Sequence, residues 1–226
     1  MQASKAVPAI PQDPTFAMFE VSSKFQASFP IRLAAHNPRL KKTEIQTKMD
    51  VNDYLIDHAS FDWPKLLSSW AWFLDEEMEV QPWLMNRFGD LFFVDEVGVV
   101  LWLNINDGEL TEVASNVDEF FELLEEDDVP DEDEDIEDED DADESASSWF
   151  LMGFVDEVSE AGMKLGPNQC YGFKVPPILG GEYDITNVYV ANVEEYWGFC
   201  GDIHSKLDGL PDGAEVEIEI RTPDSG

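Results

Sequence analysis

The sequence predicts an α+β fold in which small antiparallel sheets are flanked by helices and a long disordered acidic loop interrupts the chain. Apolar residues at helical spacing occur alongside short strand-like runs that are bounded by turn residues. The 226 residues are 43% hydrophobic and 12% aromatic, which is enough to form a buried core. Sixteen of the twenty residues 125–144 are acidic, so this stretch cannot be buried.

Residues 1–48 differ from the rest of the chain in charge and in pattern. They carry seven basic side chains against three acidic ones, with five scattered prolines and no sustained period. We predict a disordered basic extension. Two other interpretations stay open. The segment could be upstream sequence, with Met49 as the functional first residue, or, ranked third, a targeting peptide, although it lacks an amphipathic arginine face.

The N-terminal α+β part, residues 49–124, opens with helix signals. Asp62 is suited to cap a helix that has Pro64 in its first turn. The residues that follow form one apolar stripe: Leu66, Leu67, Trp70, Phe73 and Leu74. Shortly before this helix, apolar side chains also recur at helical spacing: Val51, Tyr54 and Leu55.

Strand signals follow in the same part. Residues 88–94 and 99–105 are short, mostly apolar runs, and residues 95–98 between them have turn composition. Residues 106–108 form a second turn, whose Asp-Gly pair favours positive φ. These runs predict a meander of two or three antiparallel strands.

The acidic segment, residues 125–146, is predicted to be a solvated, disordered loop between two ordered parts. Like charges at every helical and strand spacing repel each other there. Before the loop, Asn116 and Glu119 resemble a capping box that opens a helix through Leu124.

The C-terminal α+β part is predicted to span residues 147–222. Its last strand alternates valine and isoleucine with glutamate, as a half-buried strand does. The predicted elements are a helix from Ser147 that stops near Gly162, strands at 170–173 and 185–190, a helix at 194–207 and a strand at 215–220.

The net charge of −37 constrains the partner class. Such a field repels nucleic-acid phosphates and anionic membranes and attracts basic surfaces. No window approaches the roughly 18 apolar residues of a membrane span, and the N-terminus has no secretory-signal layout. We therefore expect a cytoplasmic protein that binds a basic protein and neither nucleic acid nor membrane, with its two cysteines reduced.

Enzyme chemistry finds little support in the sequence. Cys200 and His204, at i and i+4 on one predicted helix, could form a thiol–imidazole pair, but core packing of Cys200 is the favoured interpretation. Common catalytic, phosphate-binding and dinucleotide-binding motifs are absent. The acidic loop could associate weakly with calcium but has no EF-hand pattern. We predict no enzyme, no cofactor and no specific metal site.

Acidic side chains on the ordered part are the candidate partner-binding residues. Any one of them is best explained as part of a solvated face. Jointly they exceed what solubility requires, because only six lysines and arginines follow residue 48. The candidates are Asp156 and Glu157, on the helix predicted from Ser147, and Glu194 and Glu195, at the start of the helix predicted at 194–207.

Two stretches carry a family resemblance. Residues 165–184 read LGPNQCYGFKVPPILGGEYD, followed by NVYV at 187–190, GDIH at 201–204 and LPDG at 210–213. This block resembles the C-terminal domain of immunity proteins that neutralise DNase effectors of the bacterial type VI secretion system. Residues 83–92, WLMNRFGDLF, resemble the hairpin in the N-terminal, GAD-like half of the same family.

The resemblance implies an immunity protein that binds a secreted antibacterial effector, expected to be a nuclease, and blocks its basic active site. The alternative is an acidic scaffold or nucleic-acid mimic that binds a basic host protein. An enzyme using Cys200 and His204 ranks third. The long acidic run and the extension 1–48 depart from the family's pattern.

The block at residues 165–184 is predicted to define the fold. Pro176-Pro177 fixes an extended path, and Gly180-Gly181 permits a tight turn with positive φ. Tyr171, Phe173 and Tyr183 can pack together. We expect Phe173, and Trp102 at the centre of an apolar run, to lie in the core.

Overall fold

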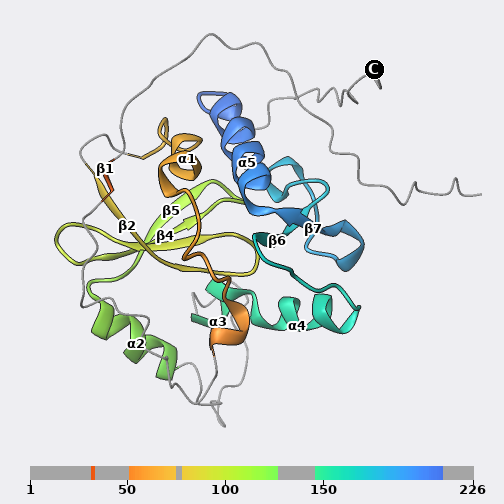
Figure 1. Ribbon diagram of the computed structural model, residues 1–226, viewed down its shortest axis with the longest axis horizontal. Coiled ribbons are helices and arrows are strands. Elements are labelled where there is room, and N and C mark those ends of the chain that lie inside the picture. Colours follow the sequence, from red (N-terminus) through yellow and green to blue (C-terminus); the bar gives the residue numbers. More distant parts are fainter. Residues whose placement is uncertain (1–31, 34–50, 75–77, 127–145, 211–226) are drawn as a thin grey trace, which may run out of the picture. The chain divides into compact units, whose positions relative to one another are not determined.

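The computed structural model describes residues 32–33, 51–74, 78–126 and 146–210. The chain divides into two compact units. One comprises residues 1–26 and 209–226, of which Gly209 and Leu210 are described. The other, residues 27–208, holds every helix and strand discussed below (Figure 1).

The first sheet has five strands in the order β1-β2-β3-β4-β5. Strands β2 to β5 form an antiparallel meander of four strands where two or three were predicted, and the two-residue β1 pairs in parallel with β2. β1 lies within the segment 1–48. The strands are β1 (Arg32–Leu33), β2 (Glu79–Met85), β3 (Leu91–Val94), β4 (Val100–Asn104) and β5 (Glu109–Ala114).

The turn between β3 and β4 is closed by one side chain. The Oδ1 atom of Asp95 accepts hydrogen bonds from the backbone N–H groups of Val97, Gly98 and Val99, at 2.9, 2.8 and 2.9 Å. Gly98 has φ +99°, which a residue with a Cβ adopts only with strain. The predicted turn at 95–98 is therefore confirmed, with Asp95 as its organising residue.

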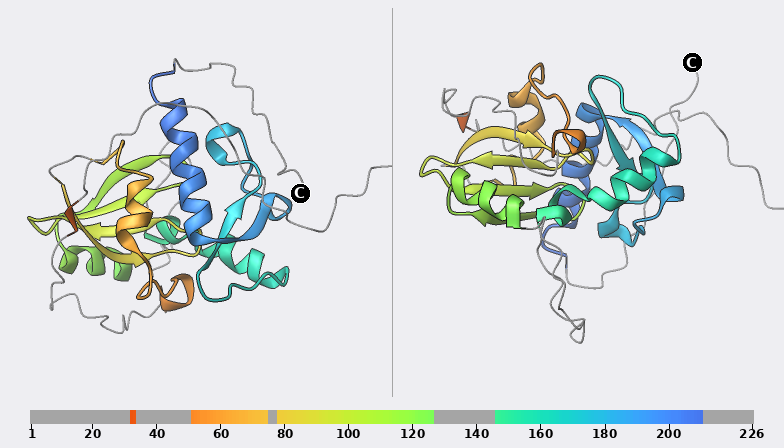
Figure 2. Two further views of the ribbon diagram at one scale, coloured as in Figure 1. Left: turned by 45° about the horizontal axis from the view of Figure 1, so that its top comes forward. Right: turned by 90° about the horizontal axis from the view of Figure 1, so that it is seen from below.

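The two faces of this sheet bury different residues because side chains alternate along each strand. On one face Val80, Met85 and Phe93 join α1 (Trp63–Ser68) and α5 (Val193–Leu207) in a core around Trp70 and Trp197. The opposite face is covered by α2 (Val117–Glu126) and α3 (Ala146–Phe150). Figure 2 shows these helices on either side of the sheet.

Helix starts follow the predicted capping signals. Asp62 caps α1 and accepts from the N–H of Lys65, and Pro64 stands in the first turn. Asn116 accepts from the N–H of Glu119 at 3.0 Å, while the Glu119 carboxylate accepts from the N–H of Ser115. α2 continues through Glu126, two residues into the predicted acidic loop. α1 is shorter than the apolar stripe suggests, because residues 69–73 form turns.

The helix predicted from Ser147 to Gly162 is instead two helices, α3 and α4 (Met152–Glu160). They are separated by Leu151, whose φ of 50° lies in the left-handed region. The break lets Trp149 and Phe150 pack under the first sheet while Val155 and Val158 pack under the second. Gly162, with φ +92°, ends α4 as predicted.

The second sheet pairs β6 (Gln169–Phe173) with β7 (Val188–Asn192), antiparallel. Its two faces are covered by different helices. Cys170 belongs to the core around α5, whereas Tyr171 and Phe173 pack with α4. The two-stranded sheet is thus sandwiched between α4 and α5. Two small antiparallel sheets flanked by helices make this an α+β fold, as predicted.

Two core predictions have different outcomes. Phe173 is fully buried, as predicted. Trp102 is predicted to lie in the core but is only partly buried: it packs at the margin of the core that faces α2 and stacks on Phe92, with ring centroids 6.2 Å apart. The apolar pattern of a strand does not predict how completely helices cover each of its side chains.

Several predicted segments lie beyond the residues described. They are most of the basic extension 1–48, most of the acidic loop 125–146 and the strand at 215–220. Among the helices that the structure describes, none is both long and apolar enough to span a membrane.

Candidate functional site: a partner-binding surface

Asp156 and Glu157 lie on α4, exposed to solvent. The Asp156 carboxylate accepts a hydrogen bond from the Tyr54 hydroxyl, with O–O distances of 3.1 and 3.2 Å to its two oxygens. Burial of Tyr54, followed by this hydrogen bond, raises the pKa of the phenol above its usual value. Asp156 therefore also links α4 to the 3₁₀ helix Val51–Tyr54, whereas the Glu157 side chain is exposed and has no hydrogen bond to the described residues.

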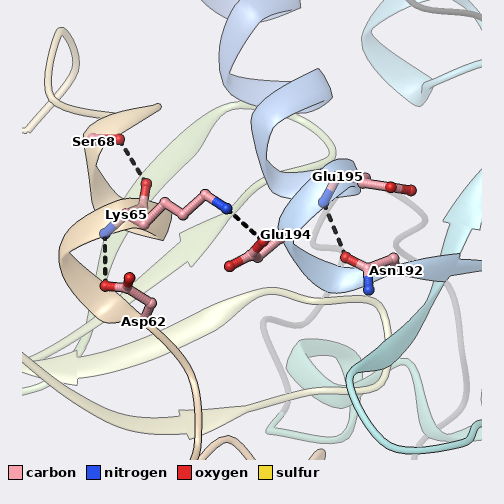
Figure 3. A network of polar contacts seen from close by, with 6 residues as sticks. All are labelled: Asp62, Lys65, Ser68, Asn192, Glu194 and Glu195. Carbon is pink, nitrogen blue, oxygen red and sulfur yellow. Dashed lines mark hydrogen bonds and ion pairs between the residues drawn. The ribbon is translucent and has the colours of Figure 1, made fainter.

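Glu194 and Glu195 stand in the first turn of α5, where negative charge is favourable at a helix N-terminus. Asn192 caps this helix and accepts from the N–H of Glu195 at 3.3 Å. Glu194 forms an ion pair with Lys65 of α1 at 2.7 Å, and that hydrogen bond raises the Lys65 pKa. Figure 3 shows the Glu195 carboxylate turned away from this pair.

The four predicted acidic residues thus form two separate pairs. Asp156 and Glu157 stand on the helix that covers one face of the β6–β7 sheet, and Glu194 and Glu195 on the helix that covers the other. Within each pair one carboxylate already has an intramolecular partner, Tyr54 or Lys65. The sequence does not reveal this division of roles, because both partners are distant along the chain.

A buried polar network lies beneath the surface, where the first sheet meets the second. The Asp90 carboxylate accepts from Asn86 Nδ2 at 2.7 Å, from the Ile105 N–H at 3.0 Å and from Asn106 Nδ2 at 3.0 Å. Burial nevertheless raises the Asp90 pKa to about 7, because removal from water outweighs the three donors. Asn86 also donates to the carbonyl of Trp149 at 2.9 Å.

This network explains the 83–92 stretch in physical terms. Asn86 Oδ1 accepts from the N–H groups of Phe88 and Asp90 and so folds the turn before β3. Gly89, with φ +89°, places its carbonyl where Trp197 Nε1 donates to it at 2.8 Å. The stretch holds α5 against the first sheet, which is a structural role.

The cysteine and histidine of α5 lack the properties of a nucleophilic pair. Burial raises the pKa of the Cys200 thiol well above its usual range, and that of Cys170 likewise. Burial also lowers the pKa of His204, whose Nε2 donates to the carbonyl of Ile105 at 3.1 Å. A protonated thiol is a poor nucleophile. Within 51–74, 78–126 and 146–210, no cluster of three or more ligating side chains could hold a metal ion.

The connection between β6 and β7, residues 174–187, is a compact surface loop that we call the presenting loop. Asn187 braces it: its Nδ2 donates to the carbonyls of Val175 and Glu182, both at 2.9 Å, and its Oδ1 accepts from the Val175 N–H at 2.9 Å. A Cβ at Gly181 would overlap the Val175 carbonyl, so the chain closes on itself there. Gly180, at φ +83°, makes the predicted tight turn.

Three large apolar side chains of the presenting loop face solvent: Val175, Ile178 and Tyr183, at 47, 42 and 45% exposure. The Tyr183 ring rests on Phe173, with centroids 4.9 Å apart, and its hydroxyl donates to Asp107 at 3.0 Å. The sequence predicts that residues 165–184 define the fold, and it does not predict that these three apolar side chains are exposed. The signal was present: apolar residues flank prolines in a stretch without period, where no helix or strand could bury them.

The comparisons with known proteins bear on this region. Residues 132–204 match the family described as type VI secretion system (T6SS) immunity protein Tdi1, C-terminal. No curated protein matches the chain. The matched range includes the presenting loop and the four predicted acidic residues, and it supports a T6SS immunity protein that neutralises an effector.

Proposed function

We propose that this protein is a cytoplasmic immunity protein that binds a nuclease effector and blocks its basic active site. The observation that carries the proposal is charge: after residue 48 the chain has 47 acidic side chains against six basic ones, a net charge of −41. A nuclease binds phosphates with basic residues, so its active site attracts such a surface. In this proposal residues 83–92 belong to a GAD-like N-terminal half.

Electrostatic attraction makes a measurable prediction about rates. Long-range attraction accelerates encounter, and ions screen it over about 8 Å at physiological ionic strength. The association rate with a basic effector should therefore fall steeply as salt rises. The dissociation rate should change much less, because short-range contacts set it.

The test uses a catalytically inactivated nuclease domain of a type VI secretion effector as the candidate partner, immobilised for surface plasmon resonance. Glu157→Lys and Glu195→Lys are the first variants, because neither carboxylate holds a described intramolecular partner. Asp156→Lys and Glu194→Lys come second, since they also disturb Tyr54 and Lys65. Slower association in all four supports a steered encounter, and an association rate independent of salt would refute it.

A second candidate function is an acidic scaffold or nucleic-acid mimic that binds basic proteins generally. The sixteen acidic residues within 125–144 favour it. A generic basic protein such as a histone, added as a competitor, separates the two. An immunity protein should remain bound to the toxin in excess histone, whereas a general mimic should be displaced from it.

A further inference from the structure

We infer that the presenting loop, residues 174–187, is the apolar anchor of the effector interface and inserts into an apolar recess surrounded by basic residues on the effector. This inference rests on the proposed function and adds a location to it. The apolar side chains that enter the recess are Val175, Ile178 and Tyr183.

The first argument is that the loop is held rigid without a partner. The Asn187 side chain makes three hydrogen bonds across it, and the Lys174 N–H donates to the Asn187 carbonyl at 2.7 Å. The Asp184 side chain accepts from the Thr186 N–H at 2.8 Å. A loop ordered in the free protein loses little conformational entropy on binding, which is the usual gain from preorganisation.

The second argument is the exposure of its apolar side chains. Most large apolar side chains elsewhere in the described part of the fold are buried or half-buried. Among the described residues outside this loop, only Val97 and Leu210 are large apolar residues with a similar or greater exposed fraction. Tyr183 combines an aromatic face with a polar tip, and its ring is fixed by Phe173 and Phe154. Rigid aromatic side chains of this kind are enriched at the energetic centres of interfaces.

The third argument is the charge around these side chains. Glu182 and Asp184 lie in the loop, and Asp107 reaches it through the Tyr183 hydroxyl. The one lysine of the loop, Lys174, turns its ammonium to the carbonyl of Thr186 at 2.6 Å. An apolar centre with an acidic rim complements an apolar recess with a basic rim, and basic residues are expected around the phosphate-binding site of a nuclease.

The central experiment replaces Ile178 with aspartate and compares it with the same change at Val97. Both side chains are exposed, so both variants should unfold within about 0.5 kcal/mol of the parent. Affinity for the same inactivated effector domain is measured by surface plasmon resonance. We expect Ile178→Asp to weaken binding about tenfold or more, and Val97→Asp to leave it unchanged.

A second arm tests the acidic rim with two variants that change the net charge by the same amount. Glu182→Lys and Glu122→Lys change the protein's charge equally, but Glu122 is exposed on α2, outside the loop. We expect Glu182→Lys to slow association by several-fold more than Glu122→Lys.

The outcomes separate this inference from the proposed function. If the parent protein does not bind the toxin domain at all, the proposed function fails. If it binds, and both aspartate variants bind as tightly as the parent, the presenting loop is not the anchor. Equal losses in Ile178→Asp and Val97→Asp would also overturn the inference, because the effect would then belong to added charge alone.

Discussion

The Tyr196 hydroxyl donates a hydrogen bond to Asn106 Oδ1 at 2.7 Å, and through it α5 is joined to the turn between β4 and β5. The same hydroxyl accepts from the Phe173 N–H at 3.0 Å, at the end of β6. One buried oxygen therefore connects both sheets and the longest helix. All three residues are buried, so none of these bonds can be replaced by water without rearrangement.

Tyr196→Phe tests this connection. It removes one hydroxyl and leaves a buried acceptor and a buried donor unpaired, each costing about 1–3 kcal/mol. We expect a loss of about 2–4 kcal/mol in the free energy of unfolding by urea titration. Tyr189→Phe is the control, because its ring contacts Tyr196 but the described residues give its hydroxyl no hydrogen bond. Similar costs in the two variants would contradict the assigned role.

Asp90 should make stability depend on pH. Its pKa rises from 3.8 to about 7 on folding, so between these values the native state keeps a proton that the unfolded chain releases. Its contribution is complete below about pH 4, declines as pH rises and is lost above about pH 7. The effect should be on the order of a few kcal/mol.

Asp90→Asn isolates that contribution. The amide cannot titrate, so the difference in unfolding free energy between parent and variant should change over pH 4 to 7 in favour of the variant at the higher pH. Subtraction removes the contribution of the other acidic residues, which both proteins share. A difference that stays constant with pH would show that Asp90 is ionised throughout.

Two glycines of α5 offer a matched pair. A Cβ at Gly201 would overlap the Ser69 carbonyl, where α5 crosses the end of α1, whereas Gly198 has nothing within 4 Å. Gly198→Ala should stabilise the protein by up to about 1 kcal/mol, since alanine favours a helix. Gly201→Ala should instead destabilise it by about 1–3 kcal/mol, because the helix must shift. Thermal melts measure the Tm of both variants against the parent. A rise in Tm for Gly201→Ala would refute the close packing of α5 against the Ser69 carbonyl.

Phe173→Ala should leave a cavity between Phe88, Phe154 and Tyr183. Phe173 is buried, and its ring stacks on Phe88 with centroids 5.2 Å apart. We expect a cost of about 3–5 kcal/mol by denaturant titration. Val97→Ala, at a 77% exposed side chain, should cost less than about 0.5 kcal/mol. A loss below about 1 kcal/mol in Phe173→Ala would show that the site collapses freely.

Local signals in the sequence predicted several helix starts and turns, but they gave no bounds for β2 or β5. Asp62 and Asn116 cap their helices, and Asp95 closes its turn, because each side chain bonds backbone groups two to four residues away. Such bonds depend on spacing alone. The β6 and β7 strands follow from the same kind of pattern, although Ile185–Asn187 is a 3₁₀ turn before β7 begins.

Long-range relationships were not predictable in this way. The break at Leu151 allows neighbouring residues to pack in two different cores, and the partial burial of Trp102 depends on packing between elements that are distant in sequence. Of the candidate site, the sequence correctly places Asp156, Glu157, Glu194 and Glu195 on the surface. It does not reveal that Glu194 pairs with Lys65 and that Asp156 binds the Tyr54 hydroxyl. It also does not reveal that apolar side chains of the presenting loop are exposed.

The way the presenting loop closes on itself has a consequence for how such proteins diversify. Its bracing bonds run from Asn187 to residues within the loop, whereas the buried junction runs from Asp90 and Asn106 to Tyr196. Substitutions at Val175 or Ile178 leave the junction untouched, so the exposed side chains of this loop can change in sequence without disturbing the buried scaffold. Exchange of the whole family-matched segment between relatives is constrained differently, because Tyr196 and Trp197 would arrive without the Asn106 and Gly89 that receive them.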